Sequence, residues 1–210
     1  MKLNESSPIG QSQHSLSRTG VVALFFVGFA YFAFLALNRF IAADEGFYLL
    51  AAREVMSGRD LYLDFFYPQM PLLPIVGGMY FAVFGHTWIA ARLACAILTI
   101  AIGALVYFRV RRESSHSCGL IASTLFFTSY FSLCWFTTYQ TYALSTLFLF
   151  TAYYLIERSH TYTYSESSYS SLSLMIGLSL GLAISTRLFF AGTTPLVAAL
   201  VIRRFGARPA

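Results

Sequence analysis

The sequence predicts an all-α polytopic membrane protein with about six transmembrane helices and an outward-facing first loop that carries juxtamembrane helices. The chain is 57% hydrophobic and only 11% charged, whereas soluble domains are roughly 25% charged. Its mean hydropathy is +0.64, and long uncharged segments recur along it. This composition excludes an ordinary soluble domain. The net charge of +5 therefore does not indicate a nucleic-acid partner; the partner of most of this surface is the lipid bilayer.

Six apolar segments are long enough, or nearly so, to cross a membrane, which takes about 20 residues. The polar sequence TTYQT at residues 137–141 divides the longest uncharged run into two of them. The predicted spans are residues 19–38, residues 88–110, two segments within residues 117–156, residues 167–186, and a shorter span at residues 188–202.

The distribution of basic residues predicts which side of the membrane each end faces. Residues 71–85 are apolar but short and contain two prolines, so we expect an interfacial or re-entrant helix. With that segment not crossing, nine of the fourteen basic residues lie on the cytoplasmic side. Both termini are then cytoplasmic, and the acidic loop faces the periplasm or the lumen of an organelle. The expected parts are an N-terminal tail (1–18), a membrane module (19–203) with an outer loop (42–86), and a C-terminal tail (204–210).

The outer loop concentrates acidic residues in an otherwise apolar chain. Five of the nine carboxylates fall within residues 42–73, and Asp44 and Glu45 are adjacent. The following sequence predicts a short helix with Asp44 at its N-cap and Gly58 at its end. Asp44 would then lie at the lipid–water boundary. The simpler alternative is that Asp44 only caps this helix and the other carboxylates are solvated.

The stretch DEGFYLLAAREVMSGRDLYLDFFYPQMPLL at residues 44–73 resembles the first outer loop of the GT-C membrane glycosyltransferases. It is most similar to bacterial relatives of the protein O-mannosyltransferases and the lipid A aminoarabinose transferases, which implies a location in the bacterial inner membrane. FGHTWIAARL at residues 84–93 resembles the start of that family's next span, and GLSLGLAISTR at residues 177–187 resembles its glycine-rich helix that ends in a basic residue. The resemblance covers about residues 19–202, the N-terminal part of such an enzyme.

The resemblance implies transfer of a sugar from a polyprenyl-phosphate donor to a glycan, lipid or protein acceptor at the outer membrane face. Asp44 matches the catalytic aspartate, which can act as general base toward an acceptor hydroxyl. The phosphate leaving group calls for a cation; Arg187 is the first candidate and Arg92 the second, the alternative for both being an interfacial anchor. The remaining substrate-binding candidates are Glu45, Asp64, Gln69 and Gln140.

The chain also departs from the family pattern. Gln69 and Met70 stand where many relatives carry an acid or a histidine, sometimes a metal ligand, so a divalent metal has no support in the sequence and no cofactor is assigned. Gln140 stands where relatives often have a second aspartate, and an amide cannot act as a base. Such enzymes usually run past 400 residues, so the alternative is a non-catalytic membrane subunit or a lipid-carrier-binding protein.

Overall fold

The structure is a computed structural model that describes residues 8–40, 42, 44–161 and 166–203. Regular structure in these residues is helical, apart from one isolated bridge between Leu61 and Phe65. The all-α prediction is therefore confirmed for this part of the chain. The helices are α1 (Pro8–Asn38), α2 (Glu45–Met56), α3 (Leu72–Phe84), α4 (Trp88–Glu113), α5 (His116–Thr128), α6 (Tyr130–Trp135), α7 (Thr141–Thr161), α8 (Glu166–Thr186), the 3₁₀ helix η1 (Leu188–Thr193) and α9 (Thr194–Val201).

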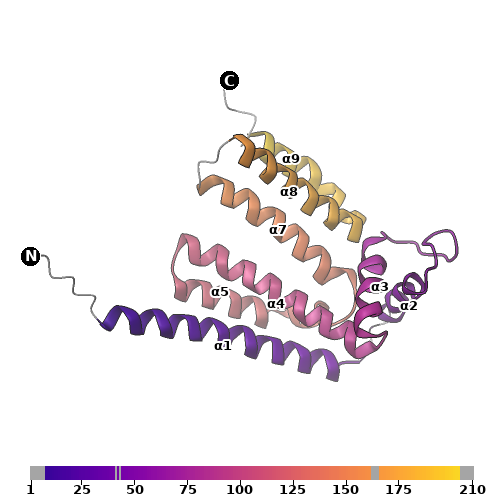
Figure 1. Ribbon diagram of the computed structural model, residues 1–210, viewed down its shortest axis with the longest axis horizontal. Helices are drawn as coiled ribbons and strands as arrows, with labels where there is room; N and C mark the ends of the chain where they lie inside the picture. Colours follow the sequence, from indigo (N-terminus) through magenta and orange to yellow (C-terminus); the bar gives the residue numbers. More distant parts are fainter. Residues whose placement is uncertain (1–7, 41, 43, 162–165, 204–210) are drawn as a thin grey trace, which may run out of the picture.

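The long helices lie side by side, and the chain reverses direction between consecutive ones (Figure 1). Helix α4 contacts α1, α5 and α7, and α7 in turn contacts α8. Helices α2 and α3 lie together across one end of this array, which we call the loop end. The N-terminus of α1 and the C-terminus of α9 point toward the opposite end, so the first outer loop and the turn after α8 meet at the loop end.

Within the described part of the chain, two helical segments are long and apolar enough to cross a membrane, namely Thr19–Asn38 within α1 and Trp88–Glu113. Leu72–Phe84, Ser170–Thr186 and Leu188–Val201 are apolar but shorter. The two long segments coincide with the first two predicted spans. The other four predicted spans correspond to helices of the structure, and their passage through a membrane stays a prediction.

One helix extends beyond its predicted span, and two predicted spans are interrupted. Helix α1 begins at Pro8, eleven residues before the predicted span 19–38, whose bounds are unchanged. The predicted third span is broken at Ser129, whose backbone is extended and whose hydroxyl accepts a hydrogen bond from the Ser132 amide, capping α6. The last segment is divided into η1 and α9, with a proline in the first turn of α9. Ser129 breaks the span because its side chain offers the backbone a hydrogen bond that competes with the helix.

The closest packing around glycine occurs at two positions. A Cβ atom on Gly103 of α4 would lie 2.3 Å from the ring of Phe127 on α5. A Cβ atom on Gly77 of α3 would lie 1.9 Å from the Tyr139 hydroxyl oxygen. Helices in lipid associate largely through such close packing, because lipid tails are as apolar as the side chains they would replace.

The loop end follows the sequence prediction closely. Helix α2 begins after Asp44 and ends before Gly58, whose φ of 82° is the left-handed conformation that glycine adopts without strain. The buried face of α2 is formed by Tyr48, Ala51 and Ala52. Leu50 of the same helix is exposed. The segment at residues 71–85 forms α3 and lies across the ends of the long helices (Figure 1).

Candidate functional site

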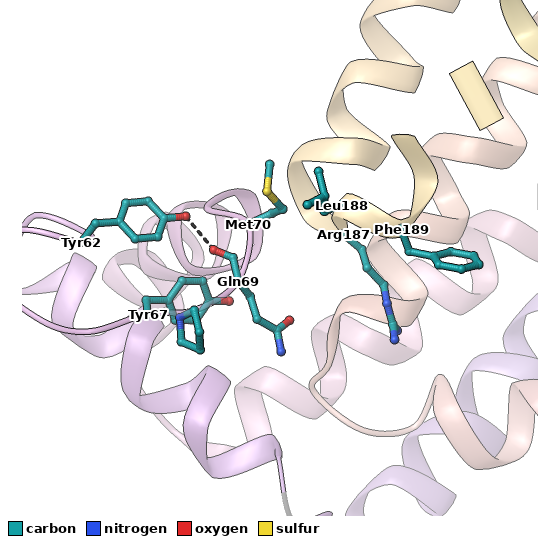
Figure 2. A pocket seen from close by; sticks show the side chains of 8 residues that line it. Tyr62, Tyr67, Gln69, Met70, Arg187, Leu188 and Phe189 are labelled. Carbon is teal, nitrogen blue, oxygen red and sulfur yellow. Dashed lines mark hydrogen bonds between the residues drawn. The ribbon is translucent and has the colours of Figure 1, made fainter. Parts of the chain in front are cut away.

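A cleft opens at the loop end between the segment that precedes α3 and the turn that follows α8 (Figure 2). Its volume is about 530 Å³, within the range of about 300–1,000 Å³ that is usual for small-molecule sites. One wall carries Gln69 and neighbouring residues, and the other carries Arg187 at the end of α8. The described residues that line it are Tyr62, Tyr67, Pro68, Gln69, Met70, Arg187, Leu188 and Phe189.

Arg187 carries the only formal charge among the described residues that line the cleft. Its guanidinium carbon lies 4.5 Å from the centre of the Tyr142 ring, a cation–π contact that holds the side chain in place. No carboxylate in the described part of the chain lies within ion-pair distance of it. The cleft is therefore electropositive and suited to an anionic group.

Gln69 faces Arg187 across the cleft (Figure 2). Tyr48 of α2 fixes the orientation of the Gln69 side chain. The Tyr48 hydroxyl donates a hydrogen bond of 2.9 Å to Gln69 Oε1. Because this bond occupies the amide oxygen, the amide N–H groups of Gln69 are the ones left for a ligand. The structure thus brings together Gln69 and Arg187, which are 118 positions apart in the sequence, and their role in substrate binding stays a prediction.

Asp44 lies at the N-cap of α2, one helical turn before Tyr48. Its side chain is exposed and makes no capping hydrogen bond, so the carboxylate is not bound to the backbone of the helix. Burial raises the pKa of the Tyr48 hydroxyl, the charge of Asp44 raises it further, and the charge of Arg187 opposes this. Both charges therefore lie within electrostatic range of the same hydroxyl, and that hydroxyl contacts the cleft through Gln69.

Glu45 and Arg92 form a fully buried ion pair away from the cleft. Arg92 Nε and Nη2 donate to the two carboxylate oxygens of Glu45, at 2.8 and 2.6 Å. The other donors of Arg92 bind the backbone carbonyls of Ala36, Arg39 and Phe40. A guanidinium has five N–H donors, and all five are used. Arg92 has no donor left for a phosphate, and the pair instead ties the segment after α1 to α4.

Glu45 also anchors the polar sequence that separates α6 from α7. The Tyr139 amide donates to Glu45 Oε1 at 2.9 Å. Burial disfavours the charged form of Glu45, but the hydrogen bonds from Arg92 and Tyr139 outweigh it and hold the pKa below its ordinary value. Gln140, the neighbour of Tyr139, is buried in this segment and does not line the cleft.

Asp64 closes a turn in the outer loop. Its Oδ2 accepts a hydrogen bond of 2.8 Å from the Asp60 amide, and its own amide donates to the Asp60 carbonyl at 3.0 Å. The side chain is exposed and is not part of the cleft. Among the described residues no group of three or more His, Cys, Asp or Glu side chains is placed to hold a metal ion.

Tyr48, Tyr62 and Tyr67 belong to the site but were not predicted from the sequence. Tyr48 could have been found, because position i+4 of a helix lies on the same face as the N-terminal Asp44. Tyr62 and Tyr67 lie in an irregular segment, where spacing does not predict which side chains meet.

A comparison with protein-family models identifies residues 68–209 as matching the dolichyl-phosphate-mannose-protein mannosyltransferase family. No curated protein and no solved structure matches the chain. The matched region includes both walls of the cleft at Gln69 and Arg187, and it begins after Asp44 and Glu45. Since the match covers more than half of the 210 residues, the chain belongs to the dolichyl-phosphate-mannose-protein mannosyltransferase family, a GT-C-type family of membrane glycosyltransferases.

Proposed function

We propose that the protein transfers a sugar from a polyprenyl-phosphate-linked donor to an acceptor hydroxyl at the outer face of the membrane. Arg187 and Gln69 hold the donor phosphate in the cleft, and Asp44 is the general base. The observation that carries this proposal is the position of Arg187. It is a cation with no carboxylate partner among the described residues, and it faces a hydrogen-bond donor across a cleft of suitable size.

The charges in the cleft favour an anionic ligand. The donor phosphate bears negative charge that grows as its bond to the sugar breaks, so a cation that faces it lowers the barrier. The guanidinium of Arg187 and the amide N–H groups of Gln69 are both donors. An arginine is also suited to bind two phosphate oxygens at once.

Asp44 suits the role of base because its carboxylate is exposed and makes no capping bond at the start of α2. General-base assistance of this kind typically contributes about 10²–10⁴-fold to a rate. Inversion at the anomeric carbon follows if the acceptor hydroxyl that Asp44 deprotonates attacks the side opposite the phosphate.

The proposed membrane arrangement places the loop end outside. We propose that α1, α4, α5 with α6, α7, α8, and η1 with α9 each cross the bilayer, with α2 and α3 at its outer surface. The clusters of arginine at the opposite end then face the cytoplasm, as positively charged loops do.

Binding of a polyprenyl phosphate to Arg187 variants in detergent tests the phosphate site. Charge-assisted hydrogen bonds are worth about 1.5–3 kcal/mol, so Arg187→Gln should weaken binding roughly 10- to 150-fold. Arg187→Lys should retain part of the affinity, because it keeps the charge but loses the planar fork. Arg53→Gln, which removes an exposed arginine of α2, is the matched control. Equal affinities for all of these proteins would reduce Arg187 to an interfacial anchor.

Turnover separates an enzyme from a carrier-binding subunit. Asp44→Asn keeps the shape of the side chain but removes the base, so turnover should fall roughly 10²–10⁴-fold with little loss of carrier affinity. Glu54→Gln on the same helix is the control, since Glu54 pairs with Arg59 on the surface. Carrier binding without any turnover in the wild-type protein would favour the non-catalytic alternative.

A further inference from the structure

The hydroxyl group of Tyr67 is buried without a hydrogen-bond partner among the described residues. Tyr67 lines the cleft and is only 2% exposed. Its ring stacks on Phe47 of α2, with 5.2 Å between ring centres and planes 10° apart, so the side chain cannot easily turn away. Buried polar groups are nearly always paired. An unpaired hydroxyl in the wall of a cleft therefore indicates that a ligand supplies the missing partner.

Tyr62 presents an exposed aromatic ring beside this hydroxyl. The two rings lie 6.3 Å apart, and the Tyr62 side chain is 53% exposed on the cleft wall. Its backbone has a φ of 70°, which is a strained conformation for a residue other than glycine. The Tyr62 hydroxyl donates a hydrogen bond of 2.6 Å to the Gln69 carbonyl, which holds the ring in place (Figure 2). Strain of this kind persists mainly at functional sites.

We infer that Tyr62 and Tyr67 form a sugar subsite, in which the pyranose ring of the donor stacks on Tyr62 and one of its hydroxyl groups hydrogen-bonds to the Tyr67 hydroxyl. This inference rests on the proposed function, because Arg187 and Gln69 must hold the phosphate to which the sugar is attached. The two tyrosines then determine which glycosyl group the cleft accepts.

The position and chemistry of the two tyrosines suit a sugar. In Figure 2 the Tyr67 hydroxyl lies beside the Gln69 side chain, on the wall that faces Arg187. A sugar linked to a phosphate between Gln69 and Arg187 would be within reach of this wall. The ring face of a pyranose is lined by C–H groups and suits an aromatic surface, while its rim carries hydroxyls that need partners. Burial raises the pKa of Tyr67, so its hydroxyl stays protonated and can donate.

The Tyr67 hydroxyl also explains why the cleft would distinguish between sugars. A site that hydrogen-bonds a particular hydroxyl rejects an analogue that lacks it, because the buried polar group is then left unpaired. The orphaned hydroxyl of Tyr67 is such a group, and a bare polyprenyl phosphate leaves it unpaired.

The test compares two affinities in detergent for each protein. One is for bare dolichyl phosphate. The other is for whichever of dolichyl-phosphate mannose and dolichyl-phosphate glucose binds more tightly. The ratio of the two measures the contribution of the sugar. Tyr67→Phe should lower this ratio roughly 2- to 12-fold, the value of one neutral hydrogen bond, and leave binding of the bare carrier unchanged. Tyr62→Leu should lower the ratio as well, and Tyr62→Phe should restore most of it, since the aromatic face is kept.

Tyr31→Phe, on α1 outside the cleft, is the matched control and should behave as wild type. The melting temperature of Tyr67→Phe should equal or exceed that of wild type, because the substitution removes an unpaired hydroxyl. A ratio near one for wild type, or an unchanged ratio in Tyr67→Phe, would overturn the sugar subsite. An equal loss of affinity for both carriers would also overturn it. The effect of Arg187→Gln on binding of the bare carrier tests the phosphate site alone. A failure of the phosphate site can therefore be distinguished from a failure of the sugar subsite.

Discussion

Loss of the Glu45 charge should destabilise the whole loop end. Glu45→Gln leaves the buried guanidinium of Arg92 without its counter-ion, and both side chains are fully inaccessible to solvent. Removing one partner of a buried ion pair lowers the free energy of unfolding by about 3–5 kcal/mol. For a chain of this size each kcal/mol lowers the melting temperature by about 2–4 °C, so we expect a fall of roughly 6–20 °C. Thermal unfolding in detergent, followed by circular dichroism, measures it.

A double-mutant cycle isolates the pair from its neighbours. Arg92→Met should also destabilise the protein, because it leaves Glu45 and three backbone carbonyls without their hydrogen-bond donor. These carbonyls belong to Ala36, Arg39 and Phe40. The double variant should be less destabilised than the sum of the two, with a coupling of about 2–3 kcal/mol. Additive effects, or a fall of less than about 2 °C in Glu45→Gln, would refute the pair as the anchor of the loop end.

The pH dependence of stability gives an independent check. Because the pKa of Glu45 lies below its ordinary value of 4.5, its contribution is present above that value and is lost as the pH falls further. The difference in stability between wild type and Glu45→Gln should therefore be constant near neutral pH and shrink below 4.5. A difference that instead shrinks between pH 8 and pH 6 would point to another group.

Three further predictions concern packing, orientation and the cleft. Gly77→Ala should destabilise the protein by about 1–3 kcal/mol, because the new methyl group meets the Tyr139 hydroxyl, whereas Gly177→Ala in the open face of α8 should not; equal melting temperatures would contradict the packing. With Cys118 and Cys134 replaced by serine, an impermeant thiol reagent outside the cell should label Ser57→Cys and not Ser114→Cys; the reverse pattern would invert the topology. Tyr48→Phe should weaken polyprenyl-phosphate binding roughly 2- to 12-fold, since it releases Gln69; unchanged binding would show that Gln69 needs no such support.

Local sequence signals predicted the loop end well. Asp44 precedes α2 as predicted, although its side chain makes no capping hydrogen bond. The glycine after this amphipathic stretch marks the end of α2, because left-handed turns depend on residues close in sequence. The break at TTYQT was predicted for the same reason: α6 ends at Trp135 and α7 begins at Thr141. Ser129 was missed because a single serine within an apolar run is common in membrane helices, and only its geometry reveals the cap.

Long-range pairing could not be predicted from the sequence. Glu45 and Arg92 were both expected to contact substrate. They are 47 positions apart, and no local signal in the sequence indicates that they bond directly to each other. Gln69 and Arg187 were both proposed from a resemblance, but their positions on facing walls depend on how α3 and α8 pack. The unpaired hydroxyl of Tyr67 depends on how the cleft is assembled and cannot be predicted from the sequence.

The bonds of Glu45 also imply an order of assembly during synthesis. Its partner Arg92 leaves the ribosome 47 residues later, and the amide of Tyr139 follows 94 residues after Glu45. Until then the glutamate has to remain hydrated at the membrane surface, because an unpaired charge is costly in lipid. Asp44, the immediate neighbour of Glu45, would gain a fixed position only once the chain has returned to the loop end near residue 139. Nascent chains released before that point should therefore insert into the membrane and yet lack a formed site.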